Sequence, residues 1–305
     1  MTLRDYHLTL RDVSDQQPEY LETVFSLGNG HFGVRANDPI SGNPIAGTLI
    51  NGFYETAPIT YGEAGVGYAK QHQTILNLPD LRHIHVSTSS GHQFTHSKRT
   101  AADLDLGTGE LMEHYQINTD QGETIMMGVK SVIGQEQTSM WSAEYTFTAG
   151  NYASGLLVSK SIAVPAEAEA IMSADPRKTR MAGLPICETE FVSQDLQRYH
   201  VKTRLTKQAV TMYLGILLPH GQLLQQPLDL SDEQPHSLEY AAYVGTVGKH
   251  NTIDPAAMFM ASSLATLTED SQTFWQGVWT RSEVSVGSNC LLYTSPSPRD
   301  PKTAR

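Results

Sequence analysis

A glycine-rich segment, Gly28-Asn-Gly-His-Phe-Gly33, has the spacing GxGxxG that holds a pyrophosphate in dinucleotide-binding proteins. That chemistry needs a helix that begins directly after the glycines, because the positive end of the helix binds the phosphates. The next residues, 34–44, contain two prolines, a glycine and two asparagines, and they cannot sustain a helix. We therefore interpret the glycines as a tight strand-to-strand connection in which they supply positive φ, and we expect no cofactor.

Histidines and cysteines offer a second kind of chemistry. His83 and His85 would share one face of a strand, and His92 and His96 follow, so a metal pair is conceivable. The sequence shows no third ligand in register, and histidines on a half-exposed sheet are the favoured interpretation; we expect no metal. Cys187 has no basic partner nearby in sequence and is interpreted as a packed thiol.

A loop carboxylate, Glu63, lies two residues after Tyr61, and acidic residues that bind sugars are often found near aromatic residues. A solvated loop glutamate is the favoured alternative. Other aromatic side chains could stack on sugars, although packing residues with one polar atom are more common; they are Tyr54, Tyr68, Trp141, Trp275 and Trp279. No segment has the GxSxG spacing of a serine nucleophile, and these patterns identify no catalytic residue.

The elements that would position these residues are mostly strands. Apolar and polar residues alternate with period two in several runs that are rich in β-branched and aromatic residues and bounded by turn residues such as 119–122. The alternating runs are 83–86, 124–129, 140–147, 155–162 and 237–244, and 210–218 is a longer apolar run of the kind that is buried on both faces. Strands at short spacing without intervening helices predict a mainly β fold, a large antiparallel β-sandwich.

The pattern becomes helical near the end of the chain. Asp254 and Pro255 suit the N-cap and first position of a helix, and a second helical stretch spans about Ser271 to Arg281. The two helices either connect to a further domain or cap one end of the sandwich.

Composition restricts the possible partners. The 305 residues include 32 acidic and 21 basic side chains, a formal charge of −11, which argues against nucleic acid or an anionic membrane. No apolar run approaches the roughly 20 residues of a membrane helix. The first residues carry charges where a signal peptide has its apolar stretch, so we expect a cytoplasmic protein.

The sequence of the last residues does not fit the strand and helix patterns of the rest of the chain. Segment 290–300 reads like the translation of a sequencing adapter, so the natural reading frame would end near Asn289. A disordered Ser/Pro tail is the alternative. We expect a sandwich domain over 1–252, the start of a helical linker over 253–289 and a non-native tail over 290–305.

The segment 20–35, followed by 47–54, resembles the opening of glycoside hydrolase family 65, the maltose, kojibiose and trehalose phosphorylase family. In that family a Glu precedes an apolar step, then Gly-Asn-Gly-aromatic-apolar-Gly-x-Arg, then a Gly-rich strand that ends in an aromatic residue. The positions on this pattern are Glu22, Gly28, Asn29, Gly30, Gly33, Arg35, Gly52 and Tyr54. Segment 104–111 and the Trp275-x-x-x-Trp279 spacing add support, whereas His31 and Ala36 depart from the family pattern.

The resemblance implies a galactose-mutarotase-like super-sandwich, a helical linker and then an α/α-barrel that performs the reaction. Family members are similar in cleaving an α-glucobiose with phosphate, with inversion to β-glucose 1-phosphate. A phosphorylase needs one acid, because phosphate is already the nucleophile. In the family that acid and the phosphate donors lie in the barrel, so no residue of this chain receives a catalytic role.

The resemblance leaves several hypotheses open. We expect the chain to be a structural part of a phosphorylase and to be inactive alone. Its expected partners are the barrel and a second copy of the parent in a homodimer. Whether the chain counts as an enzyme stays open. The motif residues, including Arg35 beside its glycine turn, are interpreted as structural. Tyr61 and Glu63 could line a substrate entrance. The alternatives are a stand-alone carbohydrate-binding sandwich and a fragment of a trehalose hydrolase.

Overall fold

Alternating side chains build one long antiparallel sheet. In β10 (Glu110–Thr119), Leu111, Glu113, Tyr115 and Ile117 are buried while Met112 and the residues in register with it face outward, as period two requires. The computed structural model describes residues 2–4, 6–11, 18–41, 47–63, 65–160, 186–193, 196–203, 208–218, 226–246 and 262–282. Within these ranges the large sheet has ten strands, and all neighbouring pairs are antiparallel.

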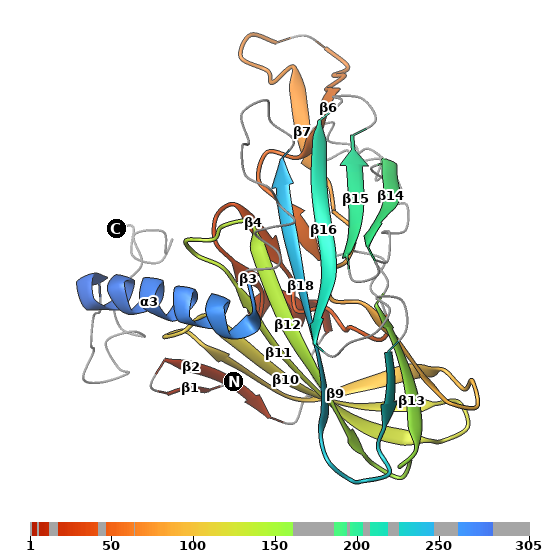
Figure 1. Cartoon of the computed structure of the whole chain (residues 1–305). Coiled ribbons are helices and arrows are strands. Elements are labelled where there is room, and N and C mark those ends of the chain that lie inside the picture. Colours follow the sequence, from red (N-terminus) through yellow and green to blue (C-terminus); the bar gives the residue numbers. More distant parts are fainter. Residues whose placement is uncertain are drawn as a thin grey trace, which may run out of the picture.

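The strands follow chain order from β1 to β12; β18 then pairs with β12, and the last three strands lie beyond β18 in reverse chain order. Their spatial order is β1 (Thr2–Arg4), β2 (His7–Arg11), β9 (Phe94–Asp105), β10, β11 (Thr124–Ile133), β12 (Met140–Ala149), β18 (His236–Thr246), β16 (Ala209–Leu218), β15 (Leu196–Lys202) and β14 (Ile186–Ser193). Figure 1 shows these strands fanning through the molecule, with β9 to β12 side by side.

Small sheets form the layer that covers the inner face. One contains β3 (Leu27–Gly28), β4 (Phe32–Val34) and β5 (Thr48–Ile50), and another contains β8 (Ile84–Thr88), β13 (Gly155–Lys160) and β17 (Gln226–Asp229). β6 (Tyr54–Pro58) and β7 (Gln71–Ile75) pair as a hairpin that projects from one end of the molecule (Figure 1). Phe32, Val86 and Val158 of the small sheets share one apolar core with Tyr115 and Tyr145 of the large one, so the layers form a sandwich.

The predicted fold class is confirmed, and each predicted run lies in a strand within the described residues. Run 210–218 was expected to be buried on both faces, but Thr211 and Tyr213 are only partly buried. The runs fall on β8, β11, β12, β13, β16 and β18; His83 immediately precedes β8, and residues 161–162 lie outside the described ranges. The 119–122 turn is also present, because Gly122 has φ of 85° and its N–H donates to the Thr119 carbonyl at 3.0 Å.

Two helices are described. α1 (Pro18–Val24) was not predicted, and α3 (Leu264–Ser282) begins seven residues before the predicted stretch at Ser271 because Ser263 caps it: the Ser263 Oγ accepts the N–H of Thr266 at 3.2 Å. The predicted helix after Asp254 and the tail from 290 lie outside the described residues. Neither described helix has the length and apolar content needed to cross a lipid bilayer.

Candidate functional site: the glycine hairpin and its surroundings

The segment Gly28–Gly33 forms a β-hairpin. Gly28 pairs with Gly33 and Leu27 with Val34, and Gly30 takes a φ of 81° in the turn. The side-chain Oδ1 of Asn29 accepts the N–H groups of His31 (3.0 Å) and Phe32 (3.1 Å), which closes the turn from within. The interpretation as a strand-to-strand connection is therefore confirmed: no helix opens after the glycines.

The amide end of Asn29 reaches a different part of the chain. Its Nδ2 donates to the carbonyl oxygens of Gly134 (2.6 Å) and Thr138 (2.8 Å), in the loop that connects β11 to β12. Both acceptor positions and both donor positions of the side-chain amide are thus used within the turn and the loop. The hairpin is tied to a loop more than a hundred residues away.

A half-buried ion pair ties the hairpin to α1. The Arg35 Nη2 lies 3.2 Å from Glu22 Oε2 and 3.1 Å from Thr23 Oγ1. The main chain repeats the connection, because the Ala36 N–H donates to the Glu22 carbonyl at 3.0 Å. The guanidinium of Arg35 therefore meets a carboxylate of the chain itself, and the pair fixes α1 against the strand that leaves the hairpin.

The last two motif positions lie further along the chain. Gly52 occupies the turn between β5 and β6 with φ of 88°, a conformation that favours glycine. Tyr54 begins β6, and its N–H donates to the Gln208 side-chain oxygen at 2.8 Å. Both positions shape the chain leading into the projecting hairpin.

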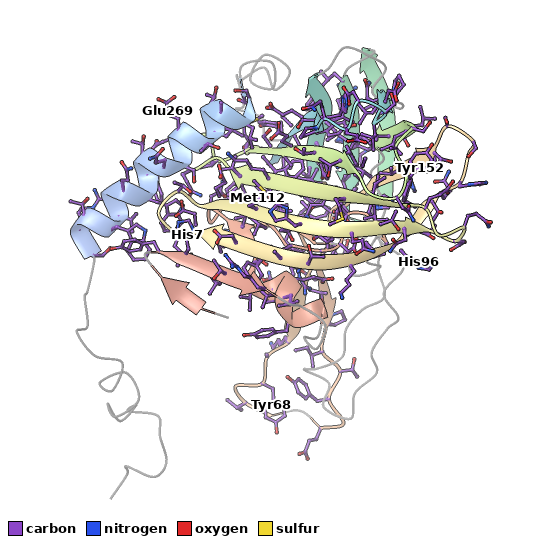
Figure 2. All side chains as sticks on the ribbon, turned by 90° about the horizontal axis from the view of Figure 1, so that it is seen from below. His7, Tyr68, His96, Met112, Tyr152 and Glu269 are labelled. Atoms are coloured by element: carbon purple, nitrogen blue, oxygen red, sulfur yellow. The ribbon has the colours of Figure 1, made fainter. Side chains whose placement is uncertain are left out.

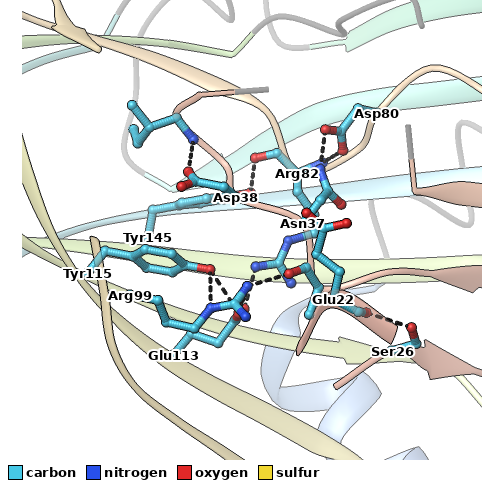
Figure 3. A network of polar contacts seen from close by, with 12 residues as sticks. Glu22, Ser26, Asn37, Asp38, Asp80, Arg82, Arg99, Glu113, Tyr115 and Tyr145 are labelled. Carbon is cyan, nitrogen blue, oxygen red and sulfur yellow. Dashed lines mark hydrogen bonds and ion pairs between the residues drawn. The ribbon is translucent and has the colours of Figure 1, made fainter. Parts of the chain in front are cut away.

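Beneath these elements lies a buried cluster of charged side chains (Figure 3). Glu113 forms ion pairs with Arg82 and, at 3.0 Å, with Arg99, and it accepts the Tyr115 hydroxyl at 2.8 Å. Arg99 also donates to Tyr115 Oη (3.0 Å) and to the Ala36 carbonyl. Burial works to lower the pKa of Arg82, but Glu113, together with Tyr115 and Tyr145, raises that pKa above its ordinary value.

A second group of charges adjoins the first. Lys160 is fully buried, donates to the Leu81 carbonyl, and lies 5.2 to 5.7 Å from the ring centroids of three aromatic residues, Tyr145, Tyr240 and Trp141. Burial lowers the pKa of Lys160 to about 7, and burial raises the pKa of the nearby Asp80 carboxyl. Asp80 accepts from Asn37 and from the Arg82 N–H at 2.8 Å.

These charged groups stabilise the sandwich. The side chains of Arg82 and Glu113 are 2% and 0% exposed, so a substrate in solution has no access to them. The sequence patterns considered above did not identify Arg82, Arg99 or Glu113 as candidate residues. One signal was present: Glu113 occupies an inward position in the alternation between Leu111 and Tyr115.

The histidines do not assemble a metal centre in the described ranges. The Nε2 atoms of His83 and His85 lie 3.3 Å apart, and burial lowers the pKa of His83 to about 4. His92 pairs with Glu123 and His96 with Asp120 on the surface. No group of three or more potential ligands occurs among the residues that the structure describes. Cys187 lies in β14, opposite Val201 of β15.

Tyr61 and Glu63 lie in the projecting β6–β7 hairpin, apart from the charged cluster. The ring of Tyr61 packs on Tyr68 with centroids 4.8 Å apart, while Glu63 and Val66 are exposed. Figure 2 shows Tyr68 near the end of this hairpin, away from the strands that carry Met112 and His96. The structure therefore pairs Tyr61 with an aromatic residue and leaves Glu63 in solvent.

Helix α3 lies against the turn between β9 and β10. Ser271 Oγ donates to the Thr108 carbonyl (2.6 Å) and Trp279 Nε1 to the Leu106 carbonyl (2.7 Å). A cavity of about 250 Å³ separates the helix from the hairpin; its lining includes Gly28, Leu104, Trp275 and Trp279. Trp279 also packs on Tyr6, with centroids 5.0 Å apart, and Trp141 is fully buried, so packing is the role of both tryptophans.

Known proteins give this geometry a context. The family model described as "Glycosyl hydrolase family 65, N-terminal domain" matches residues 8–239. An uncharacterized glycosyl hydrolase of Mycobacterium tuberculosis is 25% identical over 185 residues, covering 55% of this chain and 22% of that protein. An alpha,alpha-trehalose phosphorylase of Thermoanaerobacter brockii is 29% identical over 140 residues, covering 43% of this chain and 18% of that protein.

A solved structure shares the fold. The protein named "Putative kojibiose phosphorylase from human microbiome" aligns with a TM-score of 0.70 at 17% identity, over 91% of this chain and 38% of that one. The chain thus spans about a fifth of the curated relatives and little more than a third of the solved structure. The family match covers most of the sandwich, including the glycine hairpin and the Glu22–Arg35 pair, and the chain belongs to glycosyl hydrolase family 65 through its N-terminal domain.

Proposed function

We propose that the chain is the non-catalytic N-terminal part of an inverting α-glucoside phosphorylase of carbohydrate metabolism. The parent would convert a glucose disaccharide and phosphate to β-glucose 1-phosphate and glucose. The observation that carries the proposal is the match of residues 8–239 to an N-terminal domain, in a chain that spans about a fifth of its curated relatives. The trehalose phosphorylase among those relatives supports phosphorolysis.

The use of the buried acids supports a structural role. A general acid must come within hydrogen-bond distance of the leaving oxygen of its substrate. In the described part of the chain, Glu113 is enclosed by two arginines, Glu22 pairs with Arg35, and Asp80 accepts from Asn37. These acids stabilise the sandwich, and we assign the catalytic acid and the phosphate donors to the part of the parent that follows.

The proposed domain division gives residues 1–252 to the sandwich, 253–289 to the linker and 290–305 to a non-native tail. Helix α3 falls inside the proposed linker. We propose that the linker leads to a catalytic α/α-barrel and that the β6–β7 hairpin, with Tyr61 and Glu63, borders its substrate entrance. Phosphate and a sugar phosphate are intracellular metabolites, so the parent would act in the cytoplasm.

Recovering the parent tests this proposal. The source DNA should be sequenced past the codon for Asn289, and the longer protein should be expressed beside the 305-residue chain. We expect the reading frame to continue into helical sequence and only the longer protein to release glucose 1-phosphate from maltose, kojibiose or trehalose. A natural stop codon directly after Asn289 would contradict the proposal. Release of glucose without phosphate consumption would favour the hydrolase alternative.

A stand-alone carbohydrate-binding sandwich is the second candidate. The pair of half-buried Tyr61 and exposed Tyr68 near Glu63 favours it, because sugars stack on exposed aromatic rings. Calorimetric titration of the 305-residue chain with the same three disaccharides separates the two candidates. A binding module would give saturable heat that Tyr68→Ala removes, whereas a structural part of a phosphorylase would give none.

A further inference from the structure

A single carboxylate on α3 holds one loop of the sandwich by its main chain. Asp270 accepts the N–H of Gln135 at 2.9 Å, of Glu136 at 3.2 Å from both oxygens, and of Gln137 at 3.4 Å. Hydrogen bonds from successive amides to an ionised carboxylate are among the stronger polar contacts in proteins. The bonds join the helix to the β11–β12 loop across more than 130 residues of sequence.

The same loop is held through its carbonyls by the glycine hairpin. Asn29 donates to the carbonyl oxygens of Gly134 and Thr138, which flank the three amides bound by Asp270. Ser262, just before α3, adds a bond from its Oγ to the Gln137 side-chain oxygen at 2.7 Å. The loop is thus fixed on its carbonyls by the motif asparagine and on its amides by the helix.

Apolar packing alone does not orient α3. Only Leu264, Leu267 and Ser271 of its nineteen residues are buried, all in the first half of the helix. Beyond them lies the 250 Å³ cavity between the helix and the hairpin. The direction of the helix therefore depends on its polar anchors, with Asp270 the one that contacts three amides.

We propose that Asn29 and Asp270 are positioning residues that clamp the β11–β12 loop between them and so set the direction in which α3 leaves the sandwich. Asn29 of the glycine hairpin would then affect the direction of α3 through this loop, without contacting the helix itself. Any effect of the clamp on the position of a catalytic domain beyond the linker rests on the proposed function. The clamp itself does not depend on that function.

Hydrogen exchange followed by mass spectrometry tests the clamp in the 305-residue chain. Asp270→Asn keeps the shape of the side chain and removes its charge, so we expect amides of α3 and of 135–137 to exchange about tenfold faster or more. Glu269→Gln is the matched control, because Glu269 is the exposed neighbour on the same helix (Figure 2). It should leave exchange in α3 unchanged, and β12 should keep its protection in both variants.

The decisive variant is Asn29→Ala. The clamp predicts faster exchange in α3 as well as in the hairpin, a red shift of the emission from Trp275 and Trp279, and a double variant with Asp270→Asn whose effect on α3 is smaller than the sum of the two. Normal protection of α3 in Asn29→Ala, or fully additive effects, would overturn the proposal. These readouts need no substrate, so they are independent of whether the parent is a phosphorylase.

Discussion

Charged residues in the core of this sandwich are tolerated because each meets a partner. Glu113 neutralises Arg99 of β9 and Arg82, which lies just before β8, and Tyr115 fills a further acceptor position on the carboxylate. Removing one member of a buried ion pair leaves the others uncompensated in a medium of low polarity. The cluster should therefore dominate the response of the domain to single substitutions.

Replacing Glu113 tests that expectation. Glu113→Gln keeps the shape but leaves Arg82 and Arg99 without a counter-charge, and we expect the free energy of unfolding to fall by about 3 to 5 kcal/mol. Urea unfolding followed by the fluorescence of the buried Trp141 measures it. Asp120→Asn, whose carboxylate pairs with His96 at 72% side-chain exposure, is the control and should leave the midpoint unchanged. A midpoint for Glu113→Gln equal to that of the control would contradict the assignment.

Gly109 is constrained both by its backbone and by its neighbours. Its φ is 69°, and a Cβ there would lie 2.6 Å from Trp275 Nε1 and 2.7 Å from Ser271 Oγ. We expect Gly109→Ala to displace α3 and to lower the unfolding free energy more than Gly122→Ala, which has a similar φ of 85° and open space around it. The control should cost about 1 to 2 kcal/mol for its backbone alone. Equal losses in denaturant midpoint would show that the helix does not press on this turn.

Lys160 should make stability depend on pH. Its pKa in the folded chain is about 7, below its ordinary value of 10.5, so above pH 7 the unfolded chain holds the extra proton. Stability from this group therefore rises with pH between about 7 and 10, by up to roughly 1.4 kcal/mol per pH unit. Urea midpoints at pH 7.5, 8.5 and 9.5 should rise relative to those of Lys160→Met. Parallel curves for the two proteins would mean that Lys160 titrates normally.

At the scale of elements, α3 is hydrogen-bonded to the sandwich, whereas the β6–β7 hairpin projects from it. The helix is bonded to two separate segments of the sandwich: Trp279 and Ser271 donate to the turn between β9 and β10, and Asp270 accepts from the β11–β12 loop. Of the apolar side chains in its second half, Phe274 is exposed, whereas Trp275, Val278 and Trp279 are half-buried. The hairpin, in contrast, projects from the molecule and carries exposed side chains at its tip.

Shortening the hairpin should leave the sandwich intact. Replacing residues 60–69 by Asn-Gly keeps the Ile59–Lys70 pairing, and every described side chain removed is exposed or half-buried. We expect a thermal midpoint within about 2 °C of the parent chain, since surface changes away from special features cost little. A large drop in the midpoint would give the hairpin a role in stability and weaken its proposed place at a substrate entrance.

The local sequence pattern predicted some strands and helices and gave no indication of others. Runs such as 124–129 alternate because one side of β11 is buried there, and that periodicity is present in the sequence. β9 is polar from Thr95 to Thr100, directly after its first residue, so this part of the sequence did not predict a strand. The seven-residue α1 is too short for a clear helical period.

Pairing between distant segments could not be predicted. Nothing near β18 indicates that it inserts between β12 and β16, or that Glu239 accepts the first N–H of α3. The same holds for the candidate site: Asn29 was identified from the motif, but its bonds to the 134–138 loop depend on how two remote strands meet. Spacing in sequence reports local geometry, whereas these contacts are products of the whole fold.

At the scale of the whole molecule, one antiparallel sheet of ten strands supports small sheets, a projecting hairpin and a bonded helix. Its buried acids are used for internal ion pairs, and its family match is to an N-terminal domain. Both observations agree with the proposed function, in which this chain supports a reaction that another part of the parent performs.

Phosphorolysis by the purified 305-residue chain tests that assignment most directly. The chain would be incubated with maltose, kojibiose or trehalose, with and without inorganic phosphate, and both glucose and glucose 1-phosphate would be quantified, with circular dichroism confirming that the protein is folded. We expect neither product above the level of a protein-free control. Sustained, phosphate-dependent formation of β-glucose 1-phosphate by this chain alone would contradict the account.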